Sequence, residues 1–422
     1  MSKIVVLGTS VAAIKAIEDI RQNDQASEIT LFAFDGFYAY DRTLFSKLIA
    51  KEIATSDCLY RQKSFYEKNR INVIFDKTIT RINTKRNKIF TEEKDQFDYD
   101  LLLIADSPTH KFPDIKGTNK IGLLGLKRLK DIDQIVKSIP IFDTVIINGD
   151  SLFSLQIAYA LIKRGKEVIL IVSTDRLLAM ILEDEPSKWL MSFLEEKGLR
   201  IIVNNSIAEV LGDSDAKAVR LKSGKVIGAQ LICFENTAED LRIFAEAGIE
   251  VKNKICVDHQ FKTNVDNVFA LDQVCEGADA QMTFDIGVSS SVLEEQGKVV
   301  AAKIANQELA FTSLLTINSF EAEGFSCVFI GKIEQSSTIV QHQVIDPVSK
   351  NYKKIFIDNG SIVGAILVNA NKESDKFFNL IKDKVGVGGL EDFVLDAQND
   401  YARIVDEVQK RSAPTDPAVN TV

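Results

Sequence analysis

The chain opens with residues whose types and spacing suit the binding of a diphosphate. Residues 4–7 are apolar and mostly β-branched, which is typical of a buried parallel strand, and Gly8 follows where a sharp turn is needed. Ser10 and Ala13 complete a G-x-S-x-x-A pattern, and apolar residues at helical spacing come next. A strand, a turn and a helix in this order hold a dinucleotide diphosphate on the helix N–H groups. A crossover without any ligand is the alternative, because Ser10 stands where the usual pattern has glycine.

The same pattern returns in the middle of the chain at Gly149, Ser151 and Ser154. Here the chemistry argues against an anion, because Asp150 would place a carboxylate at the helix end that attracts phosphate. Aspartate and serine are also favoured helix N-caps, so we expect Asp150 or Ser151 to satisfy the N–H groups that a phosphate would use. The second strand ends at Val172, where an acid would contact a ribose. Binding of a dinucleotide and loss of that binding both remain open.

Residues 28–47 supply further groups that a dinucleotide needs. Asp35 comes just past a second predicted strand, where a carboxylate is expected on an adenosine ribose. Arg42, Ser46 and Lys47 follow and add two cations and a hydroxyl. These groups suit a diphosphate and an electron-rich ring.

Composition excludes several other classes of function. The 422 residues carry a net charge of −9, so we expect no nucleic-acid interface. The apolar runs are shorter than the roughly 18 residues that span a membrane. Five scattered cysteines and three distant histidines show no redox-dithiol, cluster or metal-ligand spacing. The first strand starts at residue 3, which leaves no room for a signal peptide, and we expect a cytoplasmic protein without a metal.

Strands are predicted between and after the two glycine turns. Residues 71–75, 78–82 and 88–91 are typical of a meander, and 99–105 form another buried strand. Strands that alternate with helices predict an α/β fold with parallel sheets.

The last part of the chain, from about residue 313, has a different pattern. It predicts four strands joined in part by a hairpin at Asp358-Asn-Gly360, followed by a helix over 373–384. Apolar residues at helical spacing then predict one amphipathic helix between Gly389 and Arg411, which packs on its own domain or docks a partner. Residues 412–422 are expected to be a disordered tail.

Taken in order, these elements resemble the FAD/NAD(P)H-dependent pyridine nucleotide-disulphide oxidoreductase superfamily, in the branch of rubredoxin reductases, ferredoxin reductases and the nitrite reductase large subunit. Residues 38–47 (YAYDRTLFSK) are similar to the family segment PYxRPxLSK. Residues 264–274 (NVDNVFALDQV) are similar to vFAaGDv, and the EQGK at 295–298 resembles the EQGR-type helix that follows it. The resemblance covers about residues 1–370. It implies an α/β fold with two Rossmann-like, glutathione reductase-type dinucleotide-binding domains plus a C-terminal α+β domain.

The resemblance also implies domain limits. They are an FAD-binding domain in two parts (1–112 and 256–312), an NAD(P)H-binding-like domain (113–255), a C-terminal α+β domain (313–388), and an amphipathic helix with a flexible tail (389–422).

Site residues follow from the same resemblance. FAD would contact Gly8, Ser10, Ala13, Asp35, Arg42, Ser46, Lys47, Ile79, Ala105, Asp272 and Gln273. A nicotinamide nucleotide would contact Gly149, Ser151 and Ser154. Ile79 matches a backbone contact to adenine. Lys47 would lie near the flavin ring and stabilise negative charge on the reduced flavin, which makes it the expected catalytic residue.

The chain departs from the family pattern at several turns. The A-T-G turn is here Ala105-Asp-Ser, and the A-x-G turn is residues 235–237, where Asn236 tolerates positive φ, so we expect the backbone shape to survive. The Gly-Asp pair that holds the ribityl chain is replaced by Asp272 and Gln273. Gln273 is able to bond a hydroxyl, and a slip of one residue would give that role to Asp272.

Two functions are therefore expected. In the first, FAD passes electrons between a nicotinamide nucleotide or redox partner and an electron-transfer protein, such as a rubredoxin, ferredoxin or iron–sulphur subunit. In the second, the chain is a non-catalytic or partner-dependent reductase-like subunit of a larger complex, with a degenerate NAD(P)H site. Either function suits a homo- or hetero-oligomer.

Overall fold

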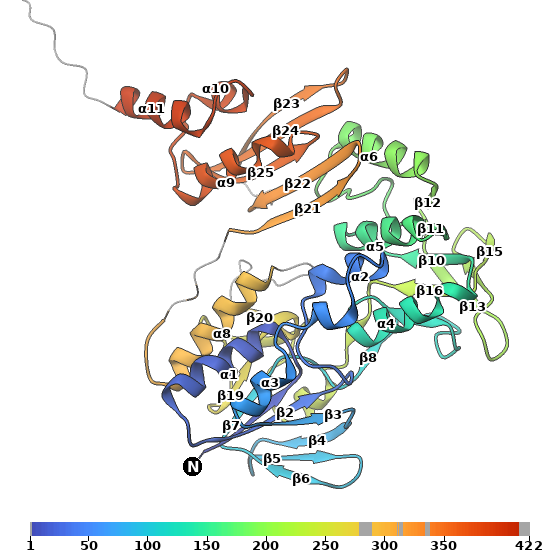
Figure 1. Ribbon diagram of the computed structural model, residues 1–422, viewed down its shortest axis with the longest axis vertical. Coiled ribbons are helices and arrows are strands. Elements are labelled where there is room, and N and C mark those ends of the chain that lie inside the picture. The colour runs from blue at the N-terminus through green and yellow to red at the C-terminus, as the bar shows by residue number, and fades with distance from the viewer. Residues whose placement is uncertain (1, 278–288, 310, 312–314, 334–337, 413–422) are drawn as a thin grey trace, which may run out of the picture. The chain divides into compact units, whose positions relative to one another are not determined.

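The computed structural model describes residues 2–277, 289–309, 311, 315–333 and 338–412 (Figure 1). The chain folds into two compact units. The first comprises Met1–Asp175 and Leu194–Leu314, and the second Arg176–Phe193 and Leu315–Val422. The tail expected at 412–422 lies outside the described residues from residue 413 onwards.

The first unit contains two five-stranded parallel sheets. One has the order β19-β7-β1-β2-β3. Its strands are, in that order, Val268–Ala270, Leu101–Ile104, Lys3–Leu7, Glu28–Ala33 and Ile71–Phe75. The other has the order β12-β11-β10-β16-β9. Its strands are Leu199–Ile202, Glu167–Ile171, Thr144–Asn148, Leu231–Phe234 and Leu123–Gly125. The predicted pair of Rossmann-type sheets is confirmed.

The meander expected after residue 70 is wrong for its first strand. β3 pairs in parallel with β2, because helix α3 (Lys63–Lys68) brings the chain back to the start of the sheet. The antiparallel meander is made by β4 (Ile79–Asn83), β5 (Lys88–Thr91) and β6 (Gln96–Asp98). A second antiparallel sheet is made by β13 (Ile207–Leu211), β14 (Ala218–Leu221) and β15 (Val226–Gly228).

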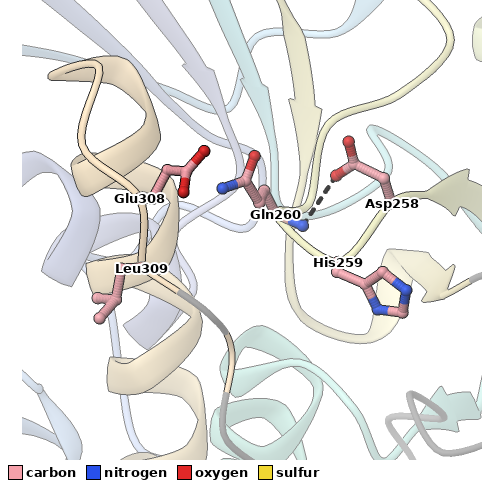
Figure 2. A pocket seen from close by; sticks show the side chains of 5 residues that line it. All are labelled: Asp258, His259, Gln260, Glu308 and Leu309. Atoms are coloured by element: carbon pink, nitrogen blue, oxygen red, sulfur yellow. Dashed lines mark hydrogen bonds between the residues drawn. The ribbon is translucent and has the colours of Figure 1, made fainter.

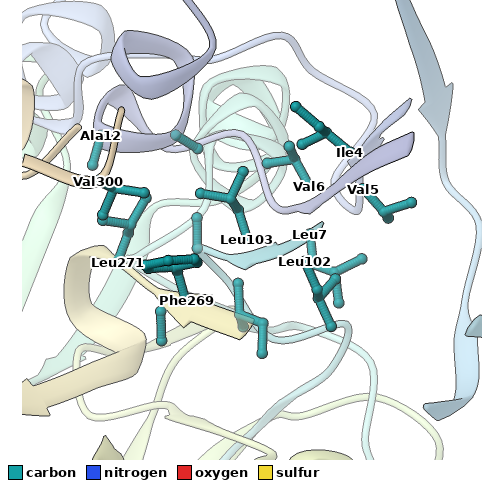
Figure 3. Packing of buried hydrophobic residues seen from close by; sticks show 14 of the residues in the cluster. Ile4, Val5, Val6, Leu7, Ala12, Leu102, Leu103, Phe269, Leu271 and Val300 are labelled. Carbon is teal, nitrogen blue, oxygen red and sulfur yellow. The ribbon is translucent and has the colours of Figure 1, made fainter. Parts of the chain in front are cut away.

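A core of aliphatic side chains fixes the strand that leads to Gly8. Residues 4–7 of β1 are each at most 2% exposed, and Figure 3 shows them packed with Leu102, Leu103 and Phe269 of the neighbouring strands. Helix α1 (Val11–Asn23) lies against α8 (Ser290–Ile304). The approach is close, since a Cβ on Gly297 would collide with the Ala12 carbonyl oxygen. Each fully buried aliphatic side chain contributes about 1.5–3 kcal/mol, so the end of β1 is held firmly.

The two sheets present their glycine turns at equivalent places. Leu7 pairs with Ile104, so Gly8 lies beside Ala105. In the other sheet Asn148 pairs with Phe234, so Gly149 lies beside Glu235. Helix α5 (Leu152–Lys163) follows the second turn as α1 follows the first.

The second unit is built on an antiparallel sheet of order β21-β22-β25-β24-β23. Its strands are Ile317–Ala322, Phe325–Gly331, Ser361–Val368, Asn351–Asp358 and Val340–Asp346. The four predicted strands are present, and β21 is an additional one. The hairpin is confirmed, with positive φ at Asn359 and Gly360. Helix α9 (Ser374–Lys382) forms where a helix was predicted.

The single amphipathic helix expected between residues 389 and 411 is wrong. The chain forms α10 (Glu391–Leu395) and α11 (Tyr401–Ser412) instead. The buried ammonium groups of Lys353 and Lys376 donate to the last α10 carbonyls, at 2.5 Å to Leu395 and 3.1 Å to Val394. These bonds satisfy carbonyls that would otherwise continue the helix. Polar residues 396–400 then favour a turn over a helix interior.

Candidate functional site

The first glycine turn has the backbone that a diphosphate site needs. Gly8 has φ +99°, and a Cβ there would collide with the Asp106 Cβ. Ser10 is the N-cap of α1, and its hydroxyl accepts the Ala13 N–H at 3.2 Å. Among the described residues, the preceding helical N–H groups at 11 and 12 have no acceptor. The register places the uncharged Ala105 beside Gly8, and the adjacent acid, Asp106, bonds to basic side chains of the protein.

An acidic side chain next to this turn, Asp106, is paired with basic side chains of the protein. The Asp106 carboxylate lies 2.9 Å from His110 Nε2 and 3.3 Å from an Arg128 guanidinium nitrogen. Burial alone would raise the pKa of Asp106, but Arg128 and His110 lower that pKa more, so the net shift is downward. The carboxylate is therefore ionised and neutralised within the protein. Neither residue was predicted as a site residue: Arg128 lies 22 residues from Asp106 in sequence, and His110, although only four residues away, shows no motif spacing.

Asp35 and Arg42 lie near the same turn with different partners. Asp35 is 5% exposed and accepts a hydrogen bond from the Tyr40 hydroxyl at 2.7 Å, and burial raises its pKa. Burial acts to lower the pKa of the Arg42 guanidinium, but the charges of Asp272, Tyr40 and Asp106 act in the opposite direction and are stronger. The net result is a raised pKa for Arg42. The guanidinium donates no hydrogen bond to any of the described residues. Arg42 is therefore a fixed cation with donors available to a ligand.

Residues 272 and 273 form a short 3-10 turn against α8. Asp272 has φ +62° and is 2% exposed, and its N–H donates to Gln296 Oε1 at 2.8 Å. Its carboxylate accepts the Gln273 N–H at 2.7 Å, and burial raises its pKa. In the described part of the chain, Gln296 Nε2 is a buried donor without a partner. Gln296 was part of the resembling EQGK segment but was not predicted as a site residue, since its environment is set by α8 packing.

The remaining expected contacts are spread over two elements. Ser46 and the exposed Lys47 lie on α2 (Phe45–Ile49), directly after the short 3-10 helix that begins at Arg42. Ile79 begins β4, and its side chain is 4% exposed in the core of the first unit. The roles expected of Ser46, Lys47 and Ile79 stay predictions.

The second glycine turn is filled by a side chain of the protein. The Glu235 carboxylate is 3% exposed and accepts the Ser154 hydroxyl at 2.6 Å and the Ser151 N–H at 3.3 Å. The Ser151 hydroxyl also bonds to this carboxylate. A Cβ on Gly149 would collide with Glu235 Oε2. The carboxylate thus occupies the concave side of the turn, a role that was not predicted for Glu235.

Helix capping at this second turn is confirmed. Ser151 is the N-cap of α5 and accepts the Ser154 N–H at 3.2 Å, as expected of Asp150 or Ser151. Asp150 accepts the Thr174 hydroxyl at 2.8 Å. The cap and the acid are therefore both used within the protein.

The positive φ expected at Asn236 is wrong. The Thr237 N–H donates to the Glu235 carbonyl at 2.9 Å, which closes a three-residue turn around Asn236. The common form of such a turn has negative φ at its central residue. The chain then enters β17 (Ala238–Glu239), which pairs with β8 (His110–Lys111).

A pocket of about 580 Å³ lies elsewhere in the first unit (Figure 2). It is lined by Asp258, His259, Gln260, Glu308 and Leu309. The Asp258 carboxylate accepts the Gln260 N–H at 2.8 Å, so it is used in holding its own loop. None of the predicted site residues lines this pocket.

The thiols and acids of the described chain form neither a redox pair nor a metal site. All five cysteines are free, and burial raises the pKa of Cys58 to about 11. No group of three or more histidine, cysteine or acidic side chains in the described ranges is arranged to hold a metal. The helices that the structure describes include none with the length and apolar character of a membrane span.

Two family matches cover most of the chain. Residues 2–292 match the family described as pyridine nucleotide-disulphide oxidoreductase, and residues 317–385 match the rubredoxin NAD+ reductase C-terminal domain.

Among similar proteins, nitrite reductase [NAD(P)H] of Bacillus subtilis is 24% identical over 91% of this chain and 48% of its own length. Rubredoxin-NAD(+) reductase of Ectopseudomonas oleovorans is 26% identical over 64% of this chain and 70% of its own. The chain spans about half the length of the first two curated relatives it matches. The covalent putidaredoxin reductase–putidaredoxin complex contains a chain of the same fold, with a TM-score of 0.82 at 16% identity over 97% of this chain and 99% of that one.

Proposed function

The chain belongs to the pyridine nucleotide-disulphide oxidoreductase family, and from that membership we propose that it is a flavin-dependent oxidoreductase. FAD binds at the first turn, and electrons pass between a nicotinamide nucleotide or redox partner and an electron-transfer protein. The names of the relatives support this proposal, since one is a reductase of rubredoxin and another a nitrite reductase. When bound, FAD supplies exchange between two-electron and one-electron chemistry.

The open first turn is the observation that carries the proposal. The N–H groups at the start of α1 have no acceptor at positions 11 and 12 among the described residues, and the residue that the register places beside Gly8 is the uncharged Ala105. Such N–H groups and the helix dipole favour a diphosphate. The residues of the turn that would hold it are Gly8, Ser10 and Ala13.

Other residues would orient the rest of the cofactor. Arg42 keeps its guanidinium donors available and is suited to bidentate contact with phosphate. Gln296 Nε2 and Gln273 are the candidate donors to the ribityl chain, while Asp35 is the candidate contact to the adenosine ribose and Ile79 to adenine. Lys47, with Ser46 beside it on α2, is the candidate group that stabilises negative charge on the reduced flavin.

The wider assignments belong to the same proposal. We propose a cytoplasmic protein that works as a homo- or hetero-oligomer with a rubredoxin, ferredoxin or iron–sulphur partner. The domain limits are those expected from the resemblance, at residues 112, 255, 312 and 388. Five free cysteines are compatible with a reducing compartment.

A second candidate function is a reductase-like subunit that depends on a partner for its electrons or has lost catalysis. Glu235 at the second turn favours it, because that carboxylate uses the groups a nicotinamide nucleotide would contact. One similar Bacillus subtilis protein is itself named an assimilatory nitrate reductase electron transfer subunit.

Flavin content tests the proposed function. The purified chain should be yellow, with FAD bound in an equimolar ratio, and Arg42→Gln should weaken FAD binding at least about tenfold through loss of a charge-assisted contact. Arg42→Lys keeps the charge and should retain part of the binding. A colourless protein that also fails to take up added FAD would contradict the proposal.

A further inference from the structure

We infer that Glu235 closes the second dinucleotide turn, so that this chain does not bind NAD(P)H there and the carboxylate acts as a built-in substitute for the nucleotide diphosphate. The closure itself depends only on residues of the second sheet. Its consequence for electron supply rests on the proposed function.

The contacts of Glu235 are those that an anion makes at a helix N-terminus. Its carboxylate accepts the Ser151 N–H at 3.3 Å and the Ser154 hydroxyl at 2.6 Å, and it also bonds to the Ser151 hydroxyl. The Ser154 N–H is satisfied as well, because it donates to the Ser151 hydroxyl. A nucleotide diphosphate and this carboxylate would therefore compete for the Ser151 N–H and for the two serine hydroxyls.

Steric contact leads to the same conclusion. A Cβ on Gly149 would collide with Glu235 Oε2 and would lie 2.5 Å from the Ser154 hydroxyl oxygen. The space that glycine leaves for a close ligand is thus taken up by side chains of the protein. Glu235 is also 3% exposed, so solvent does not screen its charge from an incoming phosphate. The residues at this turn do not fit a nicotinamide dinucleotide.

The first turn of the same chain is an internal control. The register puts Ala105 beside Gly8 and Glu235 beside Gly149, so the two turns differ at this position by a carboxylate. Asp150 adds a second acid at the closed turn, and the buried Val172 follows β11 where a ribose contact would be. Loss of nicotinamide binding therefore has one principal cause and two secondary ones.

Electron supply changes accordingly. With NAD(P)H excluded, a reduced protein carrier of the iron–sulphur or similar one-electron class must deliver the electrons in the proposed function. Two successive one-electron deliveries and one proton from water then replace one hydride, which balances charge and electrons.

Nucleotide binding measured by calorimetry tests the closure, with NADH and ADP-ribose as probes and the full chain as the sample. The wild type should show no saturable binding up to about 1 mM, and Glu235→Ala should gain at least about tenfold in affinity for both probes. Glu235→Gln keeps the size of the side chain and removes its charge, so its affinity should lie between the two. Glu167→Ala removes the same charge at the opposite end of β11 and should bind as the wild type does.

Two results would overturn the inference. One is saturable binding of NADH or ADP-ribose by the flavin-loaded wild type below about 1 mM. The other is a folded Glu235→Ala and a folded Glu235→Gln that both fail to bind either probe. The flavin content of each variant measures FAD binding at the first turn, and its circular dichroism spectrum measures whether the variant is folded. A protein without flavin that also fails to take up added FAD would contradict the proposed function, while the change in affinity between the wild type and Glu235→Ala would still test the closure.

Discussion

The turn after β1 and the turn after β10 lie at equivalent places in two parallel sheets, and they differ in what faces the helix N-terminus. At the first turn the neighbouring residue is Ala105, and the adjacent acid, Asp106, is paired with Arg128 and lies in hydrogen-bond contact with His110. At the second, Glu235 turns its carboxylate onto Ser151 and Ser154. The N-terminus of α1 is therefore available to an anion from outside the protein, whereas the N-terminus of α5 is bonded to the Glu235 carboxylate.

This difference explains how the fold persists when a nucleotide site is lost. A carboxylate at a helix N-terminus stabilises the helix by about 0.3–1 kcal/mol, and Glu235 supplies it without a ligand. The buried residues of β10 and β11 remain those of a parallel sheet, with residues 145–147 and 168–171 each at most 1% exposed. Architecture and binding are therefore separable in this chain, because the sheet core does not depend on what the turn holds.

The largest expected effect is a loss of FAD affinity when Ala105, beside the first turn, is replaced by the glutamate found at the equivalent position of the second turn. Ala105→Glu should lower FAD affinity about a thousandfold, because a charge about 4 Å from a phosphate costs about 4 kcal/mol at an effective dielectric constant of about 20. Reconstitution with FAD, followed by its absorbance, measures the loss. Ala105→Gln is the control of equal size. Equal losses in both variants would mean that bulk, and not charge, separates the two turns.

The stability of the chain should depend on pH through Asp131, a partly buried acid that bonds to Gly125 of β9 in the second sheet. Asp131 of α4 (Leu129–Ser138) lies near Arg128, His110 and Asp35, and burial raises its pKa from 3.8 to about 6. Asp131 thus binds an additional proton in the folded chain between these values, and its contribution to stability should fall by about 3 kcal/mol as pH rises through about 4 to 6. Urea unfolding at several pH values should show this slope in the wild type, and Asp131→Asn should reduce it. An unchanged slope in that variant would contradict the assignment.

The two N-cap serines should differ in their contribution to stability. Ser10→Ala removes one cap bond and should destabilise the protein by about 1 kcal/mol. Ser151→Ala also takes a donor from the buried Glu235, so about 2 kcal/mol is expected. Denaturant midpoints of the two variants measure the difference. A smaller effect at Ser151 than at Ser10 would argue that Glu235 is not held by these serines.

The smallest effect is expected from the second acid of the closed turn. In the Glu235→Ala background, Asp150→Gly should strengthen NADH binding a further fivefold or so, about 1 kcal/mol, by removing a like charge. The same substitution alone should restore no binding, since Glu235 remains. Nucleotide titration of the single and double variants distinguishes these results. Recovery of NADH binding by Asp150→Gly alone would mean that Asp150, and not Glu235, prevents the nucleotide from binding.

Local pattern was enough to predict the two turns and their strands. Apolar runs before Gly8 and Gly149 and helical spacing after them are short-range signals, and the sheets formed as expected. Features that depend on partners distant in sequence were not predictable from local pattern. The residues of β3 are typical of a strand but do not indicate that its neighbour is β2, so the meander predicted for β3 is wrong. The helix after residue 389 breaks because Lys353 and Lys376 meet its carbonyls from elsewhere in the fold.

The candidate site shows the same limit. Glu235 lies 81 residues from Ser154 in sequence, so no spacing rule could predict that it bonds there. The signal that was available was an acid directly after a predicted buried strand, at the place where the family has a small residue. Arg128 and Gln296 were missed for the same reason, since their partners Asp106 and Asp272 come from other strands and turns.

The most direct test of one open and one closed turn is the visible spectrum of the purified protein under anaerobic conditions. A yellow protein should keep its flavin absorbance when excess NADH is added and lose it when dithionite is added. Rapid bleaching by stoichiometric NADH in the wild type would contradict the closure of the second turn by Glu235.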